Sequence, residues 1–184
     1  MVGGVYHVYA RGNRCEAIFR DDDDRRTYLG HFGMVAMDLG WRPLAYCLMS
    51  NHVHHLIELT EPNLSVGMRD AHRAYATEFN ARHATGGGHL FQKRFGSTRA
   101  VNDGALMYFA CYVLLNPVRA GLCMLPEQFA WSSYAATLDA RLGPRWLAPE
   151  RLIGFFGSRH RFVQIIEAVS AMGIAGFEPM TSRV

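Results

Sequence analysis

The fold is decided by the stretch Asn51-His52-Val53-His54-His55-Leu56-Ile57-Glu58-Leu59, which is apolar enough to form a core strand and yet opens with histidines. In a strand, successive side chains point to opposite faces, so His52 and His54 share one face and His55 lies on the other. Neutral imidazole is a common metal ligand, and two adjacent imidazoles on a rigid strand form half of a metal site. Taken alone, the pair is a weak signal, because most such pairs are partly buried or surface histidines with ordinary hydrogen bonds.

The segments on either side of this stretch have the pattern of an α+β fold. Residues 42–49 form a second strand, and the short link Ser50-Asn51 predicts that the two strands pair as an antiparallel hairpin. Turn signals, helix caps and apolar spacing predict further elements in the order strand, helix, hairpin, helix, strand and added helix. This order predicts an α+β sandwich with a largely antiparallel sheet flanked by helices. The additional ranges are 5–10, 22–39, 64–82, a strand within 90–101, and a helix that begins near residue 103 and ends near 116.

The last of these helices carries a second pair of polar side chains. Tyr112 and Asn116 are four residues apart, so they are neighbours on one helical face. Tyr108 is the alternative tyrosine, but it lies about 80° round the helix from Asn116, against about 40° for Tyr112.

Two motifs together, Met49-Ser-Asn-His-Val-His54 and Tyr112-x-x-x-Asn116-Pro-Val-Arg-Ala-Gly-Leu122, resemble those of the HUH-type single-tyrosine transposases. The chain is most similar to the REP-associated tyrosine transposases within that group, over a span from about Tyr6 to Tyr134. The resemblance implies a ferredoxin-like sandwich. It also implies a transposase domain over residues 1–135, with residues 136–184 as a peripheral C-terminal extension of the same domain.

The resemblance further implies the chemistry of the site. Tyr112 would attack the scissile phosphate of single-stranded DNA that bears hairpins or palindromic repeats, and would form a 5′-phosphotyrosine bond. His52, His54 and Asn116 would hold a divalent metal, although many relatives carry glutamine at the last position. The family implies Mg²⁺ or Mn²⁺, whereas two imidazoles by themselves suit Mn²⁺ or Zn²⁺ better. The relatives include dimers and monomers, so both a monomer and a homodimer stay open.

The basic residues are concentrated in the middle of the chain. The formal net charge is only +3, but the span 69–99 is rich in arginine and lysine, and a basic surface can follow a phosphate backbone. The alternative is a solvated helix face. The candidate DNA-binding residues are Arg69, Arg73, Lys93, Arg94 and Arg99.

The composition excludes several classes of protein. A length of 184 residues with 49% hydrophobic and 19% charged residues is typical of one globular domain. No apolar run approaches the ~20 residues of a membrane helix. The N-terminus lacks the basic and apolar regions of a signal peptide, so we expect a cytoplasmic protein without a membrane partner.

Two functions of other classes compete with the transposase. A non-catalytic module of the RRM type binds single strands on the same kind of sheet, but it does not explain the two histidines, Tyr112 and Asn116. A metal-dependent phosphohydrolase of small molecules would use the histidine pair but not the basic span. A covalent protein–DNA adduct separates the transposase from both.

Overall fold

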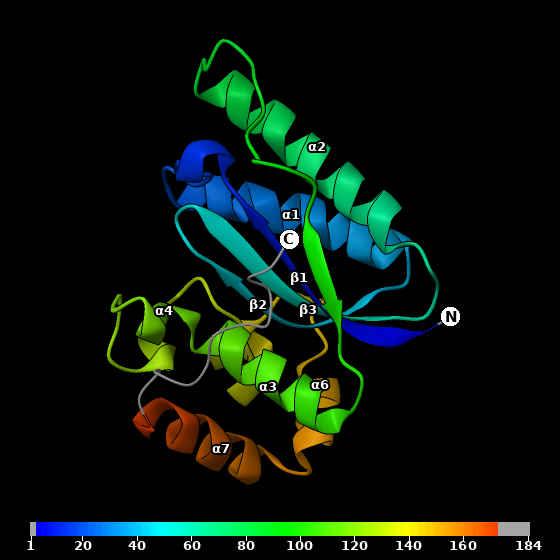
Figure 1. Ribbon diagram of the computed structural model, residues 1–184, viewed down its shortest axis with the longest axis vertical. Helices are drawn as coiled ribbons and strands as arrows, with labels where there is room; N and C mark the ends of the chain where they lie inside the picture. Colours follow the sequence, from blue (N-terminus) through cyan, green and yellow to red (C-terminus); the bar gives the residue numbers. More distant parts are fainter. Residues whose placement is uncertain (1–2, 173–184) are drawn as a thin grey trace.

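A four-stranded antiparallel sheet lies between two layers of helices in the computed structural model, which describes residues 3–172 (Figure 1). The strand order is β2-β3-β1-β4, and this arrangement confirms the α+β sandwich expected from the sequence. The strands are β1 (Gly4–Arg11), β2 (Arg42–Leu48), β3 (His52–Leu59) and β4 (Gly96–Arg99).

Helices α1 and α2 cover one face of the sheet, and α3, α6 and α7 lie on the other side (Figure 1). The α-helices are α1 (Asp22–Asp38), α2 (Leu64–Arg82), α3 (Asp103–Leu114), α4 (Asn116–Arg119), α5 (Tyr134–Leu138), α6 (Pro149–Phe156) and α7 (Arg159–Ala171), and short 3-10 turns span Asn13–Cys15, Pro126–Gln128 and Ala140–Leu142.

The pairing of β1 with β3 sets the position of the histidines. Tyr9 lies opposite His54, and Arg11 lies opposite His52. Because side chains alternate along each strand, His7 joins these four residues on the same face of the sheet. His7, His52 and His54 therefore lie on the face of the sheet that α3 covers.

The core on the other face of the sheet is mainly apolar but includes two buried histidines, His55 and His72. His55 is buried between β3 and α1, where its ring stacks on Phe32 at 4.0 Å and its Nε2 lies 2.9 Å from the Tyr28 hydroxyl. Met68 and Tyr75 of α2 are also fully buried here. Val66 of α2 is exposed, because it lies outside the stripe of that helix that faces α1 and the sheet.

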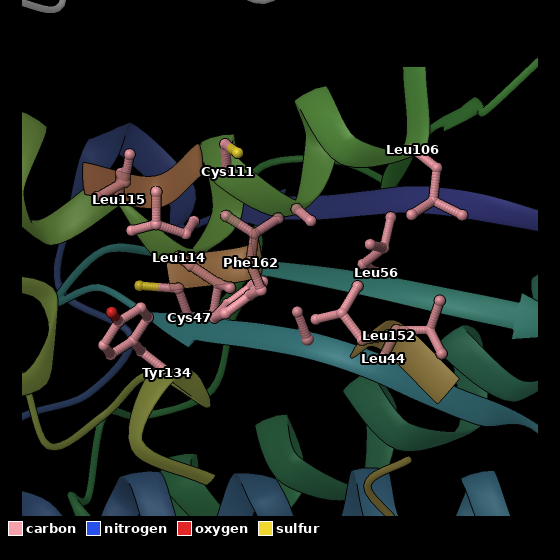
Figure 2. Close-up of a cluster of buried hydrophobic side chains, with 14 of the residues drawn as sticks. Leu44, Cys47, Leu56, Leu106, Cys111, Leu114, Leu115, Tyr134, Leu152 and Phe162 are labelled. Atoms are coloured by element: carbon pink, nitrogen blue, oxygen red, sulfur yellow. The ribbon is translucent and has the colours of Figure 1, made fainter. Parts of the chain in front are cut away.

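The C-terminal helices complete the core on the side of α3. Phe156 and Phe162 are completely buried, and Phe162 lies among side chains of α3 and β2 (Figure 2). Burial of each such side chain contributes about 1.5–3 kcal/mol. The extension expected over residues 136–184 is thus described as far as residue 172, and its remaining residues lie outside the described part of the chain.

The N-terminus of α1 is joined to the C-terminus of α2 by a charged cluster. Asp21 caps α1, because its side chain accepts a hydrogen bond from the backbone N–H of Asp24. The side chain of Asp24 is 2% exposed and accepts hydrogen bonds from Arg82 and His83. Burial raises the pKa of Asp24, but its hydrogen bonds, led by the Arg20 backbone N–H, outweigh burial and hold that pKa below its ordinary value.

We expect Asp24→Asn to lower the free energy of unfolding by about 2–3 kcal/mol at neutral pH, because it leaves Arg82 and His83 without their buried anion. The folded-state pKa of Asp24 is depressed, so its contribution is present above the unfolded pKa of ~3.9 and is lost as the pH falls through the folded pKa. Urea unfolding at several pH values checks this. The difference between the two proteins should shrink below about pH 4.

The matched control is Asp22→Asn in the same turn, where the side chain is exposed and pairs with Arg25 at 3.3 Å. Its effect should stay under about 1 kcal/mol. Equal losses for the two variants would show that Asp24 has no special part in joining α1 to α2.

Candidate functional site

The histidine face of β1 and β3 opens into a cavity of about 360 Å³. Strands β1 and β3 supply its floor, α3 supplies Tyr112, and the segment before β4 supplies basic and amide side chains. The lining residues are His7, Tyr9, Ala10, Arg11, His52, His54, Gln92, Lys93, Arg94, Gly96 and Tyr112.

Hydrogen bonds assign the tautomer of His52. The amide of Asn51 donates from Nδ2 to the Cys15 carbonyl, so its Oδ1 is the atom that lies 2.7 Å from His52 Nδ1. The proton therefore belongs on Nδ1, where it is donated to Asn51. His52 Nε2 then carries a lone pair and lies 3.3 Å from Asn116 Oδ1. Two electron-pair donors that face each other at this distance favour a cation beside them.

His54 is hydrogen-bonded to a third histidine. Its Nδ1 lies 3.0 Å from His7 Nε2, and both rings are buried. Burial lowers the pKa of His7 to about 4 and holds the pKa of His54 well below its ordinary value. Both imidazoles are thus neutral at physiological pH, which is the form that binds metals.

The ring of Tyr112 lies beside the rings of His7 and His54, and the Arg119 guanidinium packs against its face. The Tyr112 ring is 5.3 Å from that of His54 and 5.5 Å from that of His7, and the Arg119 guanidinium lies 4.7 Å from the centroid of the tyrosine ring. Burial raises the pKa of Tyr112, whereas the charge of Arg119 and a hydrogen bond with Asn116 act in the opposite direction. The phenol is therefore protonated at neutral pH.

Tyr112 and Asn116 belong to two consecutive helices, so the expectation of a single helix through both residues is wrong. Helix α3 ends at Leu114, and α4 starts at Asn116. Pro117 has no N–H to donate, and its ring would clash with the carbonyl four residues earlier, so a continuous helix is disfavoured there. The break still leaves Asn116 close to Tyr112 and His52. Tyr108 does not line the cavity.

The donor set fits a divalent metal ion. Within residues 3–172, no three histidine, cysteine, aspartate or glutamate side chains are grouped to hold one, so a metal held by His52 and His54 would need the amide of Asn116 as a third ligand. Neighbouring ligands of an octahedral ion lie about 3 Å apart, which is close to the 3.3 Å between His52 Nε2 and Asn116 Oδ1. Two imidazoles and one oxygen suit Mn²⁺ well.

Four of the five basic residues singled out in the sequence lie together. Arg69 and Arg73 of α2 face Lys93 and Arg94 across a groove of about 700 Å³. Lys93 and Arg94 also line the histidine cavity, so the groove and the cavity are adjacent. Arg99 lines neither of them and donates to the Gly3 carbonyl at 3.3 Å.

Sequence reasoning missed His7 and Arg11, which line the cavity, and Asn51, which is hydrogen-bonded to His52. His7 and Arg11 belong to β1, where alternation places them on one face, but only the register with β3 brings them to His52 and His54. Asn51 was interpreted as a turn residue, and its position directly before the histidine strand was the available signal.

In the described part of the chain, no helix is both long and apolar enough to span a membrane.

Comparison with known proteins places this chain in a family. No protein with a curated description matches the chain. One matching solved structure is a REP-associated tyrosine transposase bound to a REP hairpin, with a TM-score of 0.65 and 19% identity over 80% of this chain and 87% of that chain, which shows a shared fold. The family model described as "Transposase IS200 like" matches residues 2–113, a range that includes His7, His52, His54 and Tyr112. Since this match spans more than half of its length, the chain belongs to the IS200-like transposases.

Proposed function

We propose that this transposase cleaves and rejoins single-stranded, hairpin-bearing DNA through a covalent bond to Tyr112. The observation that carries the proposal is the convergence of Tyr112 with His54 and His52, whose rings share one cavity. Membership of the IS200-like transposases supports DNA as the substrate. The solved relative that is bound to a REP hairpin supports the hairpin form.

His52, His54 and Asn116 would hold the divalent ion, either Mg²⁺ or Mn²⁺. An ion in this position supplies Lewis-acid stabilisation of a phosphate oxygen. The neutral state of both histidines, which follows from their burial, supports this assignment.

The covalent step is a transfer of the phosphoryl group to tyrosine. Tyr112 Oη attacks the phosphorus as its proton leaves to solvent, and the bond from phosphorus to O3′ breaks. The 5′ end is then linked to Tyr112, and O3′ takes up a proton to become a free hydroxyl. The phosphodiester is retained in the new bond, so a 3′-hydroxyl can attack it in the reverse direction and rejoin a strand without ATP.

Arg119 favours this step because its positive charge lies against the Tyr112 ring at 4.7 Å. The charge stabilises the phenolate relative to the phenol and so opposes the rise in pKa that burial causes. The assistance is needed because an unperturbed tyrosine has a pKa near ~10.

The groove beside α2 would bind the DNA. Arg69, Arg73, Lys93 and Arg94 line it, and the last two connect it with the cavity of Tyr112. A strand that lies along this groove could therefore enter the cavity without leaving a basic surface. The assignment of Arg99 as a DNA contact stays a prediction from the sequence.

Tyr112→Phe removes only the attacking oxygen, so we expect it to abolish the covalent adduct and to leave hairpin binding within about twofold of the wild type. Incubation with labelled hairpin-bearing single-stranded DNA, followed by denaturing electrophoresis, measures the adduct. Tyr108→Phe is the matched control, four residues earlier on the same helix, and it should keep the adduct.

Loss of the adduct in Tyr108→Phe together with its retention in Tyr112→Phe would overturn the choice of nucleophile. Cleavage without any adduct in the wild type would favour a phosphohydrolase that activates water. DNA binding without cleavage at any metal concentration would favour a non-catalytic binding module.

His52→Ala should weaken Mn²⁺ binding by about 100-fold or more, since it removes a ligand rather than a residue that supports one. Asn116→Ala should weaken it by about 10-fold, because water can replace one oxygen ligand, and cleavage should partly return at higher Mn²⁺. Isothermal titration with Mn²⁺ and cleavage assays over a range of Mn²⁺ concentrations check both. Unchanged Mn²⁺ affinity in His52→Ala would contradict the assigned site.

The double variant Lys93→Ala/Arg94→Ala should bind the hairpin more weakly and with a smaller dependence on salt. Each lost phosphate contact reduces the slope of log K against log salt concentration by about 0.7–0.9, so we expect a reduction of about 1–2. Fluorescence anisotropy at several salt concentrations measures the slope. Arg141→Ala, at an exposed site outside the groove, is the control, and an equal change in both proteins would place the DNA elsewhere.

A further inference from the structure

We infer that His7 is a positioning residue that fixes His54 in the tautomer able to bind a metal through Nε2. The inference rests on the proposed function, because it concerns a ligand of the proposed metal site. His7 would contact neither the metal nor the DNA. It would act only through its hydrogen bond to His54.

The contact is built into the sheet. His7 lies on β1 two residues before Tyr9, which is directly opposite His54 in the register of β1 and β3. The two rings are stacked with centroids 5.1 Å apart, and His7 Nε2 lies 3.0 Å from His54 Nδ1. His7 is 1% exposed and also stacks on Phe109 of α3 at 5.2 Å. The His7 ring is therefore held from both sides in the orientation that this hydrogen bond requires.

Only one arrangement of the proton in this bond is compatible with a metal at His54. If His7 Nε2 carried a proton, His54 Nδ1 would accept the hydrogen bond and would itself be unprotonated. The neutral His54 ring would then carry its own proton on Nε2, where that proton blocks a metal. If His54 Nδ1 donates to His7, its Nε2 has a free lone pair. A metal on His54 Nε2 thus requires His7 to be the acceptor.

The other ring nitrogen of His7 is unsatisfied whichever ring carries the shared proton, so it does not force His7 Nε2 to be the donor. This nitrogen, Nδ1, is buried and has no hydrogen-bond partner among the described residues. No neighbouring N–H therefore requires Nδ1 to be an acceptor, and the ring can carry its own proton there while Nε2 accepts from His54.

His52 has the same support from a different residue. Its Nδ1 lies 2.7 Å from Asn51 Oδ1, as His54 Nδ1 lies 3.0 Å from His7 Nε2. Metal-binding histidines usually donate their second ring N–H to such an acceptor, which sets the tautomer and the ring orientation. Both acceptors here are uncharged, so they orient the imidazoles without placing a negative charge beside an incoming phosphate.

Variants of His7 test the inference through metal affinity. His7→Leu removes the acceptor and should weaken Mn²⁺ binding by about 10-fold or more, as measured by isothermal titration. His7→Gln places an amide oxygen near the position of Nε2 and should restore the affinity to within about threefold of the wild type. His55→Leu is the matched control, since His55 is the next residue after His54 but lies on the opposite face. It should bind Mn²⁺ as the wild type does.

The tautomer can be observed directly in the unaltered chain. Nitrogen-15 NMR of the histidine rings, with Zn²⁺ as a diamagnetic probe, should show His54 with its proton on Nδ1 and the metal on Nε2. This measurement does not depend on whether the variants fold. Thermal unfolding of His7→Leu and His55→Leu separates any loss of stability from a loss of affinity.

Each outcome decides a different claim. Wild-type affinity in His7→Leu, or failure of His7→Gln to restore the affinity, would overturn the role of His7 while leaving the metal site in place. Zn²⁺ bound to His54 Nδ1 would do the same. A wild-type chain that binds neither Mn²⁺ nor Zn²⁺ at His52 and His54 would overturn the metal site and, with it, the inference.

Discussion

The antiparallel register between β1 and β3 is the constraint on which the rest of the site depends. Because side chains alternate with a period of two, a shift by one residue would move His52 and His54 to the face covered by α1 and α2. It would also separate His54 from His7, whose hydrogen bond crosses the two strands. The apolar faces resist such a shift, since Val53 and Ile57 are completely buried on one side and Leu56 on the other.

The second requirement is a helix that holds a tyrosine over this face. Helix α3 packs on β2 and β3, and its buried side chains share a core with Phe156 and Phe162 from the C-terminal helices. Phe156 and Phe162, which follow the tyrosine motif in the sequence, thus help to set the position of α3 relative to the sheet. Asn116 starts α4 directly after the break at Leu115, and its Oδ1 lies 3.3 Å from His52 Nε2. Packing on one side of α3 and a backbone constraint at its end together define the site.

Much of the fold and of the candidate site could be predicted from the sequence, because the strongest sequence patterns depend on residues that are close together in the chain. Alternation placed His52 and His54 on one face, and helix-cap signals predicted that α1 begins near residue 22. The role of His7 could not be predicted, because its contact with His54 arises from the pairing of strands that lie nearly fifty residues apart in the sequence. The end of α3 at Leu114 was missed because the four-residue spacing of Tyr112 and Asn116 suggested a continuous helix. The basic residues on α2 could be counted in the sequence, but the groove that they form with residues 88–95 requires the tertiary structure.

We propose that one cavity brings a metal ion to the tyrosine. A crystal of the wild-type chain grown with Mn²⁺, with anomalous diffraction recorded at the manganese absorption edge, tests it most directly. We expect one strong anomalous peak within bonding distance of His52 Nε2, His54 Nε2 and Asn116 Oδ1, on the side of the cavity that Tyr112 lines. A fully occupied manganese site that lies elsewhere and is bound by none of these three atoms would show that the cavity does not hold the metal.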